Sequence, residues 1–106
     1  MSTRRVVITG MGVVTPYGTD MNNFWNSLVE GKSAISNITK FNTEQYAVKI
    51  AGEVKDLPVE QYIDAKEQKR MDAFIHYGII AAELALKDAG ITFTDQMKER
   101  TGVFAA

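Results

Sequence analysis

The stretch KEQKRMDAFIHYGIIAAELALKDAGI, residues 66–91, decides the fold, because it carries the longest apolar run of the chain. Apolar residues recur along it at the spacing of one helical face: Met71, Phe74, Ile75, Ile79, Ala82, Ala85, Leu86 and Ala89. Ile80, Ala81 and Leu84 widen this face, and Gly90 supplies a left-handed stop. A helix apolar over most of its circumference belongs inside a layered structure, with a sheet on one side and further protein on the other.

Positive charge is densest directly ahead of this helix, at Lys66, Lys69 and Arg70. Asp64 and Glu67, three residues apart, predict a capping box for a preceding helical turn. Because an unpaired charge is costly to bury in an apolar interior, we expect the three cations on an exposed turn directly before the N-terminus of this helix.

Composition limits the function classes. The chain has 106 residues, 45% of them hydrophobic, which predicts one soluble globular unit. A net charge of −1 gives no overall field for nucleic acid or a membrane, so electrostatic recognition must come from a local patch. The absence of cysteine excludes disulfides and a thiol nucleophile in this chain and fits a cytoplasmic protein. No apolar run approaches the ~18 residues of a membrane span.

The N-terminal stretch RVVITGMGVV, residues 5–14, is continuously apolar and β-branched, which predicts a central strand buried on both faces of a sheet. Gly10 and Gly12 resemble the start of a dinucleotide-binding turn. However, Thr15 stands where the third glycine belongs, and Pro16 separates the turn from the next helix. We therefore expect the glycines to allow close backbone packing, with no nucleotide cofactor.

Three further segments follow in order. Thr19 or Asp20 is expected to cap a helix over residues 21–30. Its expected inward residues are Phe24, Trp25, Leu28 and Val29. Residues 32–43 are predicted to form a surface loop, and residues 49–54 an edge strand or extended segment.

The remaining elements complete an α/β pattern. Pro58 begins a short helix through Ile63, and Thr94 or Asp95 caps a last helical turn. Residues 101–106, TGVFAA, begin a second buried strand without a polar turn after it, so we expect a segment of a longer protein. Two buried strands joined through helices predict parallel pairing by right-handed crossovers, with a ligand site beyond the carboxyl ends of the strands.

Catalytic candidates are few. His76 is the single histidine, and Asp72 lies four residues earlier on the same helix face. This spacing could orient an imidazole for base catalysis. A hydrogen-bonded histidine on the polar stripe of a packed helix is the favoured interpretation, because no nucleophile or metal-ligand partner accompanies it.

Three segments carry a family resemblance: RRVVITGMGVVTPYGTD, then WNSLVEGKSAI, then the organising stretch at residues 66–91. Together they resemble the N-terminal part of the β-ketoacyl-[acyl-carrier-protein] synthase II family, over the whole of residues 1–106. The resemblance implies the first segment of the N-terminal domain of a thiolase-like αβαβα fold, in which two chains form a homodimer.

The resemblance also implies a chemistry and a partner. Condensing enzymes of this kind join acyl and malonyl thioesters by decarboxylating Claisen condensation, using a cysteine, two histidines and a lysine that all fall beyond residue 106. The family's carrier-docking cations match Lys66, Lys69 and Arg70 one by one, so these residues are expected to bind acyl carrier protein. No metal, cofactor, nucleic acid or membrane is implied.

Two alternatives to a fatty acid synthase segment stay open at this point. One is a non-catalytic domain, related to condensing enzymes, that binds only a carrier or another partner. The other is a segment of a polyketide ketosynthase, because the opening motif is shared across that superfamily.

Overall fold

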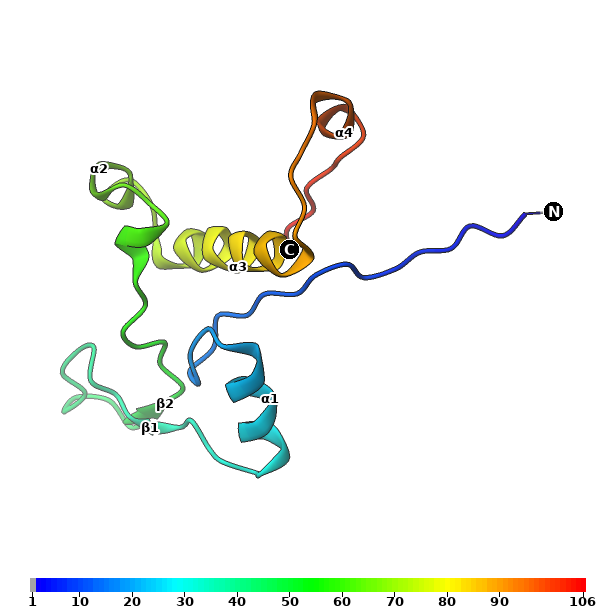
Figure 1. The fold of residues 1–106 in the computed structure, drawn as a ribbon. Helices are drawn as coiled ribbons and strands as arrows, with labels where there is room; N and C mark the ends of the chain where they lie inside the picture. Colours follow the sequence, from blue (N-terminus) through cyan, green and yellow to red (C-terminus); the bar gives the residue numbers. More distant parts are fainter. Residues whose placement is uncertain (1) are drawn as a thin grey trace.

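Helix α3 (Ala73–Ala89) is the longest element of the computed structural model, which describes residues 2–106 (Figure 1). The helix ends at Gly90, whose φ of 65° is left-handed and whose N–H donates to the carbonyl of Leu86. Glycine reaches this conformation without the steric cost that a Cβ brings. The predicted helix and its stop are therefore confirmed.

Gly10 and Gly12 let the N-terminal segment lie directly against α3. A Cβ on Gly10 would stand 2.3 Å from the carbonyl oxygen of Ala85 and 2.6 Å from the nitrogen of Ala89. A Cβ on Gly12 would stand 2.2 Å from the carbonyl oxygen of Ala81. The three alanines are spaced four residues apart and form one flat stripe on the helix. Close backbone packing at both glycines is thus confirmed.

One polar contact fixes the position of this segment along the helix. The backbone N–H of Met11, between the two glycines, donates to Oδ2 of Asp88 at 3.0 Å. Figure 1 shows the segment passing the C-terminal half of α3. The contact is exposed, since Met11 is 56% exposed, and it joins the segment to the last turns of the helix.

The prediction of two buried parallel strands is wrong for residues 2–106. Residues 5–14 are extended but unpaired, with Val6 92% and Ile8 82% exposed. Residues 101–106 are likewise exposed and unpaired, with Phe104 98% exposed. A strand buried on both faces needs neighbouring strands and a helix layer on each side. The described residues supply only one layer, α3.

The only sheet within residues 2–106 is a short antiparallel pair, β1 (Ser36–Asn37) with β2 (Ile50–Ala51). In this pair Ser36 lies opposite Ala51. The expected extended segment at residues 49–54 is confirmed, whereas the expected loop at residues 32–43 contains the partner strand. Two-residue strands carry no sequence signal of their own.

Helix α1 (Met21–Val29) begins as predicted, because Oδ1 of Asp20 accepts from the N–H of Asn23 at 2.7 Å. Of its predicted inward residues only Phe24 is half-buried, whereas Trp25, Leu28 and Val29 are 62%, 47% and 70% exposed and Ser27 is buried. Tyr17 packs on Phe24, with ring centroids 6.1 Å apart.

The shorter elements are η1 (Val59–Gln61), α2 (Ala65–Gln68) and α4 (Asp95–Glu99). The predicted cap of α4 is confirmed, since Oγ1 of Thr94 accepts from the N–H of Met97 at 3.2 Å. The predicted helix after Pro58 is a single 3-10 turn.

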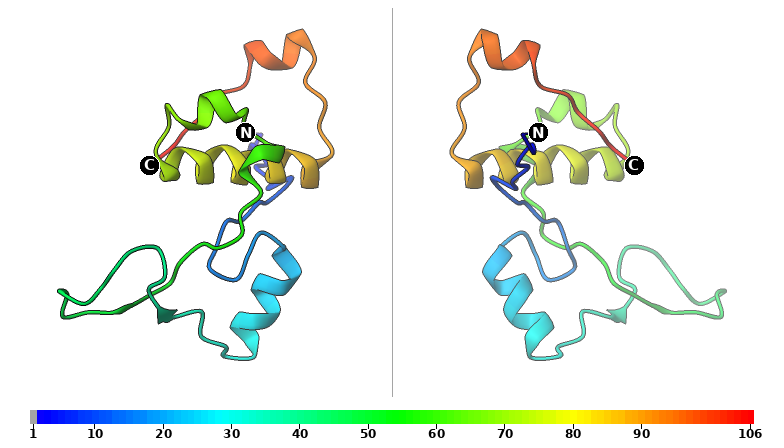
Figure 2. Two further views of the ribbon diagram at one scale, coloured as in Figure 1. Left: turned by 90° about the vertical axis from the view of Figure 1, so that its left-hand side faces the viewer. Right: turned by 90° about the vertical axis from the view of Figure 1, so that its right-hand side faces the viewer.

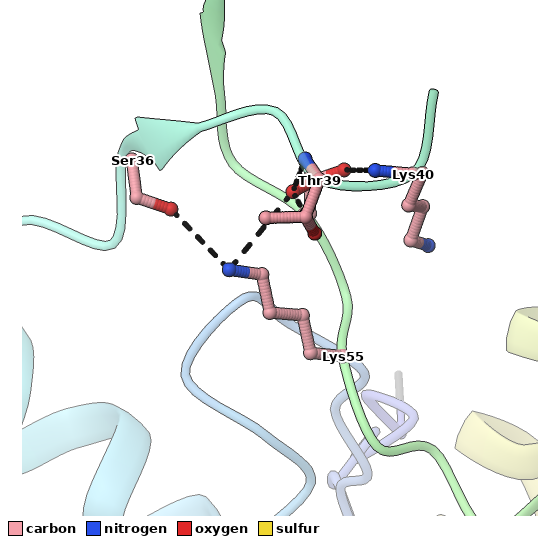
Figure 3. A network of polar contacts seen from close by, with 5 residues as sticks. Ser36, Thr39, Lys40 and Lys55 are labelled. Carbon is pink, nitrogen blue, oxygen red and sulfur yellow. Dashed lines mark hydrogen bonds and ion pairs between the residues drawn. The ribbon is translucent and has the colours of Figure 1, made fainter. Parts of the chain in front are cut away.

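Glu53 links the loop after β1 to the segment after β2, and Figure 3 shows its partners Thr39, Lys40 and Lys55. Its carboxylate, with a side chain only 7% exposed, accepts from the N–H groups of Thr39 and Lys40 at 2.9 and 3.1 Å. Lys55 lies 3.9 Å from the same carboxylate and 3.5 Å from the hydroxyl of Ser36. The hydrogen bond from Thr39 is the main cause that lowers the pKa of Glu53 from its ordinary 4.5, and burial opposes it.

Glu53→Gln is expected to open this hairpin, because the amide offers one acceptor oxygen where the carboxylate offers two. Since the pKa of Glu53 is lowered in the folded protein, its carboxylate stabilises the hairpin fully above the ordinary value of 4.5. This stabilisation is lost as pH falls through the lowered pKa. Hydrogen exchange with mass spectrometry should show faster exchange at Thr39 and Lys40 in the variant. The exposed Glu44→Gln on the same hairpin is the matched control. Equal exchange in both variants would contradict the assignment.

Taken together, residues 2–106 form an open structure (Figure 2). The radius of gyration is 17.7 Å, against about 13 Å for a compact domain of this length. The exposed area is 9146 Å², against about 5,900 Å² expected for a compact 11.8 kDa protein. None of the helices described is long and apolar enough to cross a membrane.

Candidate functional site

Three cations share one exposed turn, which we call the basic turn: Lys66, Lys69 and Arg70. Residues three and four apart lie on the same side of a helix, so the three side chains project from the same side of the turn. Helix α2, which contains Lys66, lies beside the first turn of α3 (Figure 1). The expected exposure of the three residues is confirmed.

The basic turn is anchored by Gln68. Its side-chain Nε2 donates to the carbonyl oxygen of Ile63 at 2.8 Å, and Ile63 is only 6% exposed. The half-buried amide therefore ties the turn to one of the few buried residues of the chain. Sequence reasoning missed this contact, because glutamine carries no positional signal inside so short a helix.

The predicted capping box is wrong. Asp64 does occupy the N-cap of α2, but its side chain makes no capping hydrogen bond. Glu67 turns toward Arg70 instead, with Oε1 3.6 Å from Nη1 and side chains 46% and 67% exposed. A Glu and an Arg three residues apart on a helix are a known favourable pair, so this signal was present in the sequence.

The charges of the basic turn are consequently unequal. Within residues 2–106, neither Lys66 nor Lys69 has a carboxylate within 4.0 Å, whereas Arg70 is paired with Glu67. Two free ammonium groups and one partly compensated guanidinium remain. Such a surface can attract an acidic partner at close range, because salt screens charges beyond about 10 Å at 0.1 M ionic strength.

His76 does not form the predicted hydrogen bond with the side chain of Asp72. Its Nε2 is buried and has no hydrogen-bond partner within residues 2–106. The two residues are joined only through the backbone, where the His76 N–H lies 3.4 Å from the Asp72 carbonyl oxygen. The described part of the chain therefore contains neither a His76–Asp72 side-chain dyad nor a fully hydrogen-bonded histidine. Among the described residues there is also no group of three metal-ligating side chains.

An apolar groove of about 570 Å³ separates the two unpaired extended segments above α3. Thr9 and Gly10 line one side, Gly102 and Val103 the other, and Ala85 forms part of the floor. The groove lies where the two predicted strands would need a common sheet. It contains no arrangement of polar groups suited to catalysis.

Comparison with known proteins identifies the family to which this chain belongs. Residues 3–106 match the family described as "Beta-ketoacyl synthase, N-terminal domain". The chain belongs to this family. The expected resemblance is therefore confirmed, and with it the class of fold, an α/β segment of the thiolase-like type.

Relatives of known name cover nearly the whole chain. It is 45% identical over 101 residues to the 3-oxoacyl-[acyl-carrier-protein] synthase 2 of Staphylococcus aureus strain N315, covering 95% of this chain and 24% of that protein. It is 43% identical over 103 residues to the protein of the same name from Vibrio harveyi, covering 97% of this chain and 25% of that protein. This β-ketoacyl synthase segment thus spans about a quarter of the length of these relatives.

A solved structure, that of "The ishigamide ketosynthase/chain length factor", is also similar. The TM-score is 0.76 at 35% sequence identity, over 86% of this chain and 23% of the other. The arrangement of α3 and the segments around it therefore occurs in a ketosynthase of known structure.

Proposed function

We propose that residues 1–106 are the first segment of the N-terminal domain of a 3-oxoacyl-[acyl-carrier-protein] synthase. This enzyme elongates acyl chains by decarboxylating Claisen condensation of acyl and malonyl thioesters in fatty acid synthesis. The match to synthase 2 proteins over 95% of the chain carries the proposal.

In this enzyme the present segment has structural and docking roles. It has no cysteine, so it offers no thiolate to hold the acyl group. Within residues 2–106, the buried Nε2 of His76 has no hydrogen-bond partner of the kind a catalytic base needs. The catalytic groups belong to the rest of the enzyme, while α3 and the crossing at Gly10 and Gly12 form scaffold.

The proposed partner of the basic turn is acyl carrier protein. Carriers of this type are acidic, and complementary charge steers encounter and fixes orientation more than it adds affinity. The exposure of Lys66 and Lys69, together with the anchor through Gln68, supports this role.

The bare apolar surface of the segment supports further assembly. Val6, Ile8 and Phe104 are each more than 80% exposed, and soluble proteins rarely leave large contiguous apolar patches uncovered. We infer that further strands of the same enzyme cover them and that two subunits form a cytoplasmic homodimer.

The proposal is tested by activity. The complete enzyme should release carbon dioxide from carrier protein loaded with a malonyl group, in the presence of carrier protein loaded with an acyl chain, and should form the elongated 3-oxoacyl product. The 106-residue chain alone should take up no radiolabelled acyl group, because it lacks a thiolate. Covalent labelling of the isolated chain, or no condensation by the complete enzyme, would refute the proposal.

The ishigamide ketosynthase structure favours a second candidate, a polyketide ketosynthase segment. The same assay separates the two when the enzyme is offered acyl carriers whose chains are fully reduced or retain double bonds or keto groups. A fatty acid synthase should prefer the fully reduced chains. A protein that binds the carrier but condenses none of them would be a non-catalytic relative.

A further inference from the structure

Glu67 is placed to control how much of the basic turn is available to a partner. It lies on the same helical turn as the three cations, and its carboxylate is the only one within 4.0 Å of any of them in residues 2–106. Its Oε1 is 3.6 Å from Nη1 of Arg70.

The Glu67–Arg70 ion pair is exposed, so Arg70 can exchange Glu67 for another carboxylate. The side chains of Arg70 and Glu67 are 67% and 46% exposed. Their separation of 3.6 Å is longer than a good charge-assisted hydrogen bond of about 2.7–2.9 Å. Exposed pairs of this kind are weak and are lost when a better partner arrives. Arg70 can thus leave Glu67 for a carboxylate of an incoming protein without disturbing the anchor at Gln68.

We propose that Glu67 is a positioning residue of the docking surface: it holds the Arg70 guanidinium against the turn and thereby weakens the attraction of an acidic carrier. This inference rests on the proposed docking role of the basic turn. A partner must draw Arg70 away from Glu67, and it then faces an unpaired carboxylate beside its own acidic groups. Built-in repulsion of this kind gives selectivity for strongly acidic partners at a cost in binding rate.

The chain offers a matched control for the net charge. Glu99 ends α4, is exposed, and forms no ion pair among the described residues. Figure 1 shows α2 near the start of α3 and α4 beyond its other end. The 17-residue helix between them is about 26 Å long, which exceeds the Debye length of about 8–10 Å.

The test is the association rate of acyl carrier protein with the complete enzyme, measured by stopped flow at low salt. Glu67→Gln should raise this rate by about 1.4- to 5-fold, which corresponds to ~0.2–1 kcal/mol, and should steepen its salt dependence. Glu99→Gln, which removes the same charge, should leave the rate unchanged. An equal rise in both variants, or none in Glu67→Gln, would overturn the proposal.

A double-mutant cycle shows whether Glu67 acts through Arg70. Arg70→Gln should slow association more in the Glu67→Gln background than in the wild type, because only there is the guanidinium free to reach the partner. Equal slowing in both backgrounds would mean that Glu67 contributes only its charge, and would overturn the positioning role.

Failure of this inference can be told from failure of the docking role itself. If charge reversal of the whole basic turn slows carrier binding but Glu67→Gln does not change it, the docking surface stands and Glu67 has no part in it. If neither change affects binding, the docking role is wrong.

Discussion

Replacing Gly10 and Gly12 together by alanine is expected to destabilise the protein by about 3 kcal/mol or more. Each new Cβ would stand 2.2 to 2.9 Å from three atoms of α3, and two of the three are backbone atoms in both cases. Backbone cannot move aside as the end of a flexible side chain does. The extended segment must therefore lift from the helix and lose the Met11 to Asp88 hydrogen bond of 3.0 Å.

Thermal unfolding of the complete enzyme, with hydrogen exchange at Met11, measures this effect. The matched control is Gly78→Ala, which adds the same methyl group to α3 at a position where, within residues 2–106, nothing apart from the helix's own neighbouring residues lies within 4 Å. Because alanine is the better helix former, the control should be neutral or stabilising by up to about 1 kcal/mol. Equal melting temperatures of the double variant and the wild type would show that the close crossing is not needed.

Features determined within a few residues were predictable from the sequence. The caps at Asp20 and Thr94 and the stop at Gly90 depend on one side chain and the next turn of backbone, and all three are confirmed. The need for glycine at positions 10 and 12 was also readable, since a buried apolar strand with two glycines predicts close approach. The alanine stripe that meets them was visible only as part of an apolar helix.

Burial was less predictable, because it depends on what lies next to each element. Trp25 and Val29 were assigned inward from their helical spacing, yet both are mostly exposed. The apolar face of α1 is real, but residues 2–106 place no layer against it. The same holds for Val6 and Ile8, whose sequence is that of a central strand although no neighbouring strand pairs with them within this part of the chain.

At the candidate site, the exposed cations were predictable and their pairing was not. A charged residue next to an apolar helix must stay in solvent, which fixed the exposure of Lys66 and Lys69. Glu67 had two possible partners at helical spacing, the N-cap backbone and Arg70. Sequence alone could not decide between them, and the structure joins Glu67 to Arg70.

Reversing the whole basic turn, with Lys66, Lys69 and Arg70 all changed to glutamate, is expected to weaken acyl carrier protein binding by about 10- to 100-fold. This corresponds to ~1.4–2.8 kcal/mol, near the upper range for three exposed ion pairs of ~0.2–1 kcal/mol each, because reversal adds repulsion to the lost attraction. The loss should appear mainly as slower association with a flatter salt dependence, since steering is removed while the active site is untouched. Stopped-flow binding at several salt concentrations measures both quantities.

Two controls separate docking from folding and catalysis. Activity on a small acyl-pantetheine substrate, which needs no docking surface, should survive in the triple variant. Its melting temperature should change little, because the three side chains are exposed and surface substitutions usually stay within about ±0.5 kcal/mol each. Unchanged affinity for the carrier at low salt would remove the docking role from these residues. Equal loss of activity on the pantetheine substrate would mean that the substitutions damage the enzyme itself, because Gln68 holds the turn to the buried Ile63 and a displaced turn would disturb the start of α3.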